Sequence, residues 1–417
     1  MEIRRDTYLD DLIARKHNGL IKVVTGIRRC GKSYLVFKIF RDHLREQGVP
    51  DEHVIEVAFD RRRTRNLRDP DALLDYLDPL LVGGGQRYIL LDEVQLLPHF
   101  EEVLNELAAI PGVDIYVTGS NSKFLSKDVI TEFRGRGDEV HVLPLTFSEF
   151  MQTRSDDVRH AWADYVEFGG LPLVATMASQ RQKVSYLTSL FETTYLKDII
   201  ERGGVRRTQE LEDVVNILAS SVGSLTNASK VQATFASELH SKISLNTVKS
   251  YIDLLEDAFL VHEAQRWDVK GRRYVGAPLK YYFEDVGLRN ARLGFRQVEE
   301  THLMENIIYN ELRARGYSVD VGLVRERCRT ADGTLRQTSR EVDFVANLGS
   351  RRYYIQSAYA LPDERKRIQE KASLLAIGDS FKKIVVVKDT VNVTRDEDGI
   401  VTMGLFDFLL REDSLEL

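Results

Sequence analysis

The feature that most constrains this chain is the pattern G-x-x-x-x-G-K-[ST] at residues 26–33. An apolar segment typical of a buried strand precedes it at residues 21–24, and a helical pattern follows from Ser33 to Phe40. Glycines permit a tight turn that points backbone N–H groups inward, where they and the helix N-terminus bind phosphate. The pattern therefore predicts a strand–loop–helix unit that binds a nucleoside triphosphate. The residues expected to contact the nucleotide are Gly26, Ile27, Arg28, Arg29, Cys30, Gly31, Lys32, Ser33 and Tyr34.

Two carboxylates end a second apolar segment, at residues 87–91. In a loop of this type the lysine reaches the β- and γ-phosphates and the hydroxyl residue binds Mg²⁺, so we assign these roles to Lys32 and Ser33. Asp92 is expected to hold the Mg²⁺ shell, and Glu93 is expected to polarise the attacking water as general base. The adjacent pair of carboxylates favours ATP hydrolysis over nucleotide binding alone.

Two later segments offer residues that could act on the γ-phosphate. A third apolar segment, residues 113–118, leads to Ser120 and Asn121, and either side chain is a candidate sensor of the γ-phosphate. An ordinary polar turn is the alternative. Arg134 and Arg136 flank a glycine, and either is a candidate arginine finger that stabilises charge on a neighbouring subunit's nucleotide. A solvated basic loop is the alternative there.

Composition and charge narrow the class of protein. Of the 417 residues, 43% are hydrophobic and 29% are charged, which is typical of folded domains. Apolar stretches fall well short of the roughly 18 residues that span a bilayer, and the first residues lack the apolar core of a secretory signal. Two cysteines, Cys30 and Cys328, exclude a disulfide framework. We expect a cytoplasmic protein without a membrane partner. The net charge of −6 argues against a uniformly basic surface, although a local basic patch remains compatible with it.

The order of the motifs resembles that of the AAA-type ATPases, and more narrowly the prokaryotic branch in which the ATPase is fused to the domain of unknown function DUF4143. The resemblance covers nearly the whole chain. It implies a ring, expected to be a hexamer, in which Arg134 or Arg136 acts in trans. It rests on the phosphate loop, L-L-D-E at 90–93, T-G-S-N-S at 118–122, R-G-R at 134–136, P-L-T-F-S-E-F at 144–150 and F-G-G-L-P at 168–172.

Residues 206–295 show the order helix, helix, β-ribbon that is typical of a winged helix. Ser244 is expected to cap the helix in the recognition position, and two strands at 260–264 and 280–283 are expected to flank a basic loop at 266–278. Cations interleaved with aromatic residues suit contact with DNA. The alternative is a module that packs subunits together. The residues expected to contact DNA are Lys249, Arg266, Lys270, Arg272, Arg273 and Lys280.

Residues 296–417 follow an αβββαβ order that resembles the restriction-endonuclease-like fold. Glu305 and Asp343 stand at two positions of the active site of that fold, but Gln356 and Ala358 stand where active members carry a metal-binding carboxylate and a lysine. A neutral amide is a poor metal ligand and alanine cannot activate water. We therefore expect no nuclease activity, and a role in scaffolding or DNA contact.

The predicted fold class is α/β, with four parts: an AAA-type P-loop core at 1–146, a helical lid at 147–205, a winged-helix, DUF4143-like domain at 206–295 and a degenerate nuclease-like domain at 296–417. The expected function is a Mg²⁺-dependent, ring-forming ATPase that binds or remodels DNA, including branched DNA such as Holliday junctions. The first alternative is a slow nucleotide-dependent switch or scaffold that binds a protein partner. A protein-remodelling ring would need an aromatic pore loop, which the charged loop at residues 61–68 does not supply.

Overall fold

The computed structural model describes residues 2–119, 135–329, 335–389 and 391–417. The chain divides into two compact units. The first comprises Met1–Pro144 together with Leu171–Leu173 and Asp257–Phe259, and the second comprises Leu145–Gly170, Val174–Glu256 and Leu260–Leu417.

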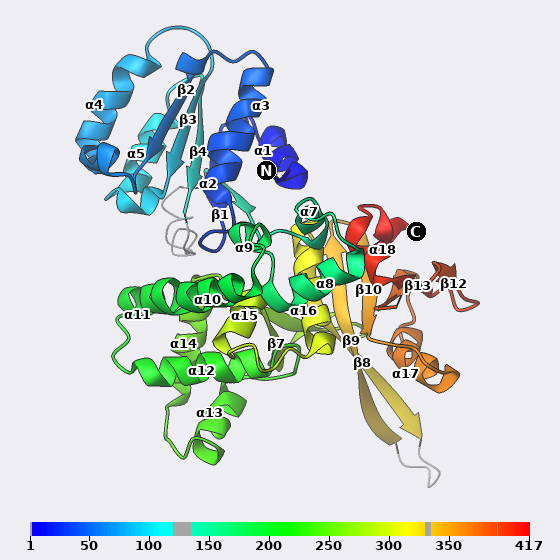
Figure 1. The fold of residues 1–417 in the computed structure, drawn as a ribbon. Helices are drawn as coiled ribbons and strands as arrows, with labels where there is room; N and C mark the ends of the chain where they lie inside the picture. Colours follow the sequence, from blue (N-terminus) through cyan, green and yellow to red (C-terminus); the bar gives the residue numbers. More distant parts are fainter. Residues whose placement is uncertain (1, 120–134, 330–334, 390) are drawn as a thin grey trace. The chain divides into compact units, whose positions relative to one another are not determined.

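The first unit is built on a parallel five-stranded sheet with the order β2-β3-β4-β1-β5 (Figure 1). All five strands pair in parallel, so their carboxyl ends lie at one edge, where ligands bind in such sheets. The predicted α/β fold with a parallel sheet is confirmed. The strands are β1 (Ile21–Thr25), β2 (Val54–Ala58), β3 (Arg87–Asp92), β4 (Val113–Thr118) and β5 (Gly137–His141).

Helices cover both faces of this sheet (Figure 1). Helix α5 (Phe100–Leu107) buries Phe100, Val103, Leu104 and Leu107, a spacing that places them on one helical face, and α4 (Pro70–Leu81) packs in the same core. On the other face, the Phe40 ring packs at a tilt against Tyr116 of β4, with the ring centres 4.4 Å apart. Among the described residues of this unit, the remaining helices are α1 (Asp6–Ala14) and a continuous helix made of α2 (Lys32–Tyr34), a π-helical segment (Leu35–Phe40) and α3 (Arg41–Glu46). Short 3₁₀ turns lie at Asp51–His53, Arg62–Arg68 and Val94–Leu96.

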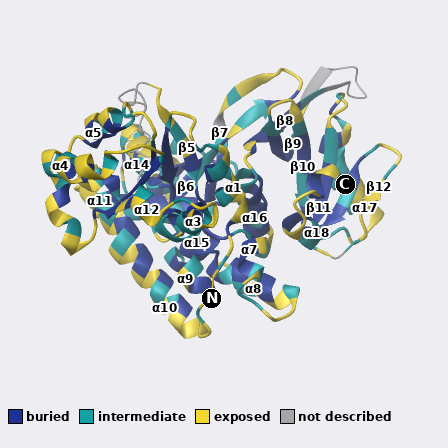
Figure 2. Ribbon diagram, turned by 90° about the horizontal axis from the view of Figure 1, so that it is seen from above, coloured by how far each residue is buried: buried dark blue, intermediate teal, exposed yellow. Residues whose placement is uncertain are grey.

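The second unit contains a mixed eight-stranded sheet with the order β12-β13-β11-β10-β9-β8-β6-β7. The centres of β9 and β10 are buried (Figure 2). Its strands are β6 (Val261–Asp268), β7 (Arg273–Phe283), β8 (Ser318–Arg329), β9 (Leu335–Leu348), β10 (Arg351–Ala358), β11 (Lys382–Val387), β12 (Thr394–Arg395) and β13 (Val401–Gly404). The predicted loop at 266–278 is wrong, because β6 and β7 continue as an antiparallel hairpin through most of it. Strand β6 also pairs in parallel with β8, so one sheet spans the boundary expected at residue 295.

Most of the helices of this unit precede β6 along the chain, and the others lie between or after the later strands. Helix α14 buries Val248, Tyr251, Ile252 and Leu255 on one face. The helices are α7 (Phe147–Met151), α8 (Val158–Phe168), α9 (Pro172–Ala175), α10 (Gln180–Leu190), a π-helical segment (Phe191–Leu196), α11 (Lys197–Gly203), α12 (Thr208–Ser220), α13 (Ala228–Ser237), α14 (Leu245–Asp257), α15 (Val286–Arg292), α16 (Glu300–Ala314), α17 (Glu364–Leu375), α18 (Leu405–Leu410) and a final 3₁₀ turn (Ser414–Glu416). Every helix in the described ranges is too short or too polar to cross a membrane.

The glycine pair of the F-G-G-L-P motif joins α8 to α15. Gly169 has a φ of +74°, and a Cβ there would collide with the Asp285 carboxylate. The Asp285 carboxylate accepts hydrogen bonds from the Gly170 N–H (2.8 Å) and from the Leu288 N–H (2.9 Å), the second of which caps α15. The motif is therefore explained by close packing of two chain segments inside this unit.

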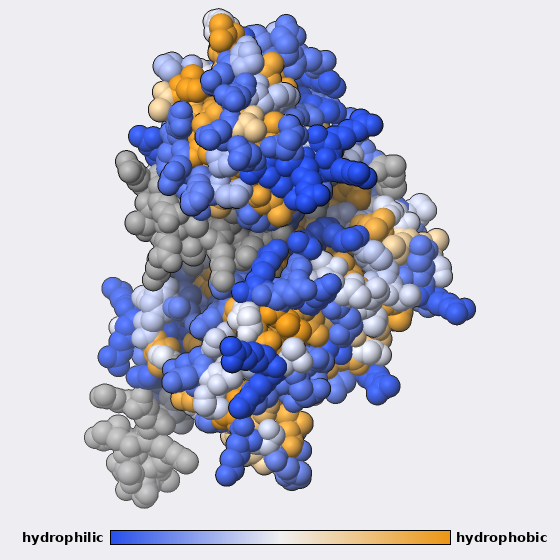
Figure 3. Space-filling view, turned by 90° about the vertical axis from the view of Figure 1, so that its left-hand side faces the viewer, coloured by the Kyte–Doolittle hydropathy of each residue, from blue (hydrophilic) through white to orange (hydrophobic). Residues whose placement is uncertain are grey.

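Hydrophilic side chains predominate on the face shown in Figure 3, and the hydrophobic ones form separate groups between them.

Candidate active site at the phosphate loop

The phosphate loop lies between β1 and α2, at the carboxyl edge of the parallel sheet (Figure 1). Gly26 has a φ of +136°, and a Cβ at this position would collide with the Val142 carbonyl oxygen. Gly31 has a φ of +106° and lies at the N-terminus of α2. Only glycine adopts both conformations without strain, so the two glycines of the motif fix the path of the loop.

Lys32 lies beneath this loop, with 4% of its surface exposed. Its ammonium group donates hydrogen bonds to the carbonyl oxygens of Gly26 (2.9 Å) and Ile27 (2.8 Å). The positive charge is thus held within the turn of backbone where the sequence predicts the phosphates.

Ser33 and Asp92 come together as predicted. The Ser33 hydroxyl donates to Asp92 Oδ1 at 2.8 Å, from the first turn of α2 to the end of β3. Asp92 is buried. A hydroxyl and a carboxylate oxygen this close offer the hard oxygen ligands that Mg²⁺ prefers.

Thr118 completes this group and was not predicted from the sequence. Because Leu91 of β3 pairs with Val117 of β4, the next residues, Asp92 and Thr118, lie side by side. The Thr118 hydroxyl donates to Asp92 Oδ1 and accepts a hydrogen bond from the Glu93 N–H at 3.1 Å. Strand register could have identified it, since a polar residue that ends the neighbouring strand must face the carboxylate that ends β3.

Glu93 follows β3 in a left-handed conformation, with a φ of +52°. Such backbone is uncommon for a residue other than glycine and is concentrated at functional sites. The Gln95 side-chain amide donates to Glu93 Oε2, which holds the carboxylate in place. The Gln95 Oε1 atom is buried and has no hydrogen-bond partner among the described residues.

Of the candidate sensors and arginine fingers, Ser120, Asn121 and Arg134 lie outside the described residues. Arg136 is exposed and directly precedes β5. The Ile21 N–H donates to its carbonyl oxygen at 2.7 Å, so Arg136 lies where β1 begins. The phosphate loop follows the other end of β1, five residues and about 16 Å away along the strand.

The basic residues predicted to contact DNA fall into two groups. Lys249, Lys270, Arg272 and Arg273 are exposed, and Arg266 is partly buried. Lys280 is only 3% exposed, and its ammonium group lies 2.8 Å from Glu305, 2.8 Å from Glu341 and 3.8 Å from Asp343. The prediction that Lys280 contacts DNA is therefore wrong, because its charge is directed into the protein.

Glu305 and Asp343, which the resemblance assigned to two positions of a nuclease-like active site, both lie next to this lysine. Burial and the nearby Glu305 carboxylate raise the pKa of Asp343 to about 8, while Lys280 opposes that shift. Burial alone would lower the pKa of Lys280, but the Glu305, Asp343 and Glu341 carboxylates outweigh it and hold that pKa above its ordinary value. The Gln356 side chain accepts a hydrogen bond from the Ser373 hydroxyl at 3.3 Å.

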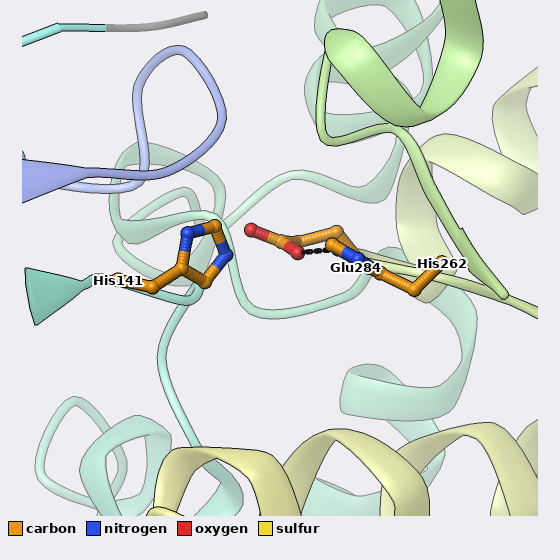
Figure 4. Close-up of side chains that lie close together, drawn as sticks. All are labelled: His141, His262 and Glu284. Atoms are coloured by element: carbon orange, nitrogen blue, oxygen red, sulfur yellow. Dashed lines mark hydrogen bonds and ion pairs between the residues drawn. The ribbon is translucent and has the colours of Figure 1, made fainter. Parts of the chain in front are cut away.

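Another buried carboxylate, that of Glu284, directly follows β7. The Glu284 carboxylate pairs with the His262 ring from β6 (Figure 4) and lies 3.4 Å from the Arg313 guanidinium. Glu284 is fully buried, and these two partners come from a strand and a helix of the same unit. Glu284 and its two partners therefore connect the open end of the β6–β7 hairpin to α16.

Comparison with known proteins places this geometry in a family. A family profile described as "AAA domain" (AAA_14) matches residues 18–151, and one described as "Domain of unknown function (DUF8612)" matches residues 159–299. A protein of Haemophilus influenzae, described as uncharacterized, is 34% identical over 415 residues, which cover 98% of this chain and 99% of that protein. The chain belongs to the AAA-type P-loop ATPase family.

Two further comparisons concern a second relative and a solved structure. The uncharacterized protein MJ1544 of Methanocaldococcus jannaschii is 27% identical over 375 residues, covering 86% of this AAA-type protein and 79% of its relative. The solved structure of the Walker-type ATPase PABY2304 of Pyrococcus abyssi covers 70% of this chain and 96% of its own, with a TM-score of 0.51 and 15% identity, which shows a shared fold. The profile that matches after the AAA domain is DUF8612, whereas the sequence resemblance pointed to DUF4143.

Proposed function

We propose that this AAA-type protein is a Mg²⁺-dependent ATPase that forms a ring, expected to be hexameric, and couples hydrolysis to the binding or remodelling of DNA in the cytoplasm. Branched DNA such as a Holliday junction is the proposed substrate. The observation that supports ATP hydrolysis is the arrangement around Asp92. Its Oδ1 atom accepts hydrogen bonds from the Ser33 and Thr118 hydroxyls, and Glu93 follows it directly in the chain.

The position of each residue in the site supports one proposed role in ATP binding or hydrolysis. Lys32 would exchange its carbonyl contacts for the β- and γ-phosphate oxygens of ATP. Ser33 and Asp92 would hold Mg²⁺, which neutralises charge on those oxygens. Glu93, oriented by Gln95, would accept a proton from the water that attacks the γ-phosphorus as the bond to ADP breaks.

The position of Arg136 supports action in trans. It lies at the start of β1, whereas the phosphate loop follows the end of that strand, so its side chain is remote from the nucleotide site of its own chain. An exposed arginine there is available to a neighbouring subunit. Arg134 shares this proposed role, and Ser120 or Asn121 remains the proposed γ-phosphate sensor.

We expect the purified protein to release inorganic phosphate from ATP with Mg²⁺, and to do so faster when duplex or four-way-junction DNA is added. Phosphate release measured with and without DNA tests this, with Lys32→Ala as the inactive control. A rate that does not respond to any DNA would favour a switch or scaffold that binds a protein partner. No release under any condition would contradict ATP hydrolysis itself.

The proposed DNA contact lies on the β6–β7 turn. Lys270, Arg272 and Arg273 are exposed there, next to Tyr274, which is 56% exposed and available for stacking. The Asp268 carboxylate accepts a hydrogen bond from the Gly271 N–H at 2.8 Å, which orders the turn that presents these cations. Lys249 on α14 and the partly buried Arg266 are the remaining proposed contacts.

Replacing Arg272 and Arg273 by alanine is expected to weaken DNA binding and to reduce the slope of log K against log salt by about 1.8, since each phosphate contact contributes about 0.9. Fluorescence anisotropy with a labelled duplex across salt concentrations measures this slope. The matched control replaces Arg365 and Arg367, two exposed arginines on α17, and changes the net charge equally. Equal effects of the two double variants would place DNA elsewhere.

A further inference from the structure

Arg5 connects the segment before α1 to the phosphate loop. Its guanidinium group is buried, with 4% of the residue exposed. Nη1 donates to the Cys30 carbonyl oxygen at 3.0 Å, and Nη2 donates to the Leu143 carbonyl oxygen at 2.7 Å. One side chain therefore joins three separate stretches of the first unit, and one of them is the loop itself.

Tyr8, one turn farther along α1, supports the same arrangement. The Arg5 guanidinium carbon lies 4.6 Å from the centre of its ring, within the range of a cation–π interaction. The Tyr8 hydroxyl accepts a hydrogen bond from the Leu143 N–H at 3.1 Å. Leu143 is thus held through its carbonyl by Arg5 and through its amide by Tyr8, which fixes the chain immediately after β5.

The contact with Cys30 determines where the next amide points. In a trans peptide the carbonyl of one residue and the N–H of the next point in opposite directions. Because the Cys30 carbonyl is directed to Arg5, the Gly31 N–H is directed away from it. A Cβ built on Gly31 would lie 3.6 Å from Arg5 Nη1, so the guanidinium packs against the loop at this residue.

We propose that Arg5 is a positioning residue for nucleotide binding: it holds the Cys30–Gly31 peptide so that its N–H faces the phosphates, and it places a permanent positive charge behind the loop. This rests on the proposed nucleotide binding. The guanidinium group stays charged at any working pH, and a charged hydrogen bond is stronger than a neutral one. Arg5 acts through the loop and does not itself contact the substrate.

Titration of the full-length protein with a fluorescent ATP analogue tests this role. We expect Arg5→Met to weaken ATP binding by roughly 10- to 100-fold, the range for loss of a hydrogen bond to a charged group. Arg5→Lys keeps the charge but cannot reach both carbonyls, so it should fall between Arg5→Met and the wild type. The KM for ATP should rise while kcat at saturating ATP changes little.

Two variants separate positioning from general destabilisation. Tyr8→Phe leaves the Leu143 N–H unpaired but does not alter the contact with Cys30, so we expect a lower Tm with near wild-type affinity. Arg4→Met removes an exposed neighbour that pairs with Asp6 and should change neither quantity. If Arg5→Met does not fold, the affinity of Arg5→Lys decides the question.

The inference is overturned if the Arg5 variants bind ATP as tightly as the wild type, or if Tyr8→Phe weakens binding as much as they do. Failure of the wild-type protein to bind any nucleotide would instead contradict the proposed function. The two failures are distinguishable because the second is seen before any variant is made.

Discussion

Glu93→Gln is expected to slow ATP turnover by about 10²-fold or more while ATP still binds. Glutamine has the size of glutamate but cannot accept the proton of the attacking water. Its carbonyl oxygen can still accept the hydrogen bond that Gln95 donates to Glu93 Oε2, so the side chain should keep its place. Ser33, Lys32 and Asp92 are untouched, and the binding of nucleotide and Mg²⁺ should persist.

Single-turnover phosphate release, together with ATP affinity measured by equilibrium titration, checks this prediction. The matched control is Glu102→Gln, which makes the same change of charge at an exposed position of α5 and should hydrolyse ATP at the wild-type rate. Wild-type turnover in Glu93→Gln would remove Glu93 from its proposed role. A loss of ATP affinity equal to the loss of turnover would instead show that the substitution disturbs the loop.

The central site could be predicted because its residues belong to local patterns. The glycines, Lys32 and Ser33 occur within eight residues, and Asp92 ends an apolar segment whose strand character is plain from its composition. Thr118 could not be identified from the sequence because its role depends on how β3 and β4 pair, and the polar residues that follow it are equally plausible from local sequence. Arg5 was missed for a similar reason: its two acceptors are Cys30 and Leu143, which only the folded sheet brings together.

The length of the β6–β7 hairpin and the burial of Lys280 could not be predicted from local sequence patterns. Charged residues on the exposed side of the hairpin interrupt the apolar pattern, so the sequence predicts two strands that are too short and a loop between them. Lys280 was counted among surface cations, although the aromatic residues that follow it are typical of a buried strand. Its partners, Glu305 and Glu341, lie on α16 and β9, far along the chain, and no local pattern connects them.

Lys280→Met is expected to lower the free energy of unfolding by about 3–5 kcal/mol near pH 8.5, the usual cost of removing one partner from a buried ion pair. Methionine fills the space of the lysine stem but leaves Glu305 and Asp343 without their cation. Tyr282, fully buried beside them, donates its hydroxyl to Glu305 at 2.5 Å, which satisfies only part of that charge. The exposed Lys270→Met on the same hairpin is the control and should change stability by less than about 0.5 kcal/mol.

The carboxylates that lose their cation in Lys280→Met determine how the stability of this variant changes with pH. Burial and the nearby Glu305 carboxylate raise the pKa of Asp343 in the folded protein, and removal of the opposing ammonium group raises it further above its value in the unfolded chain. The folded variant then binds more protons than the unfolded chain above about pH 4, so its stability falls as the pH rises. The difference from the wild type should be small at pH 4.5 and largest at pH 8.5, as measured by urea unfolding at both values. A difference that is the same at both pH values would show that Lys280 stabilises the hairpin by packing and not as the cation of this cluster.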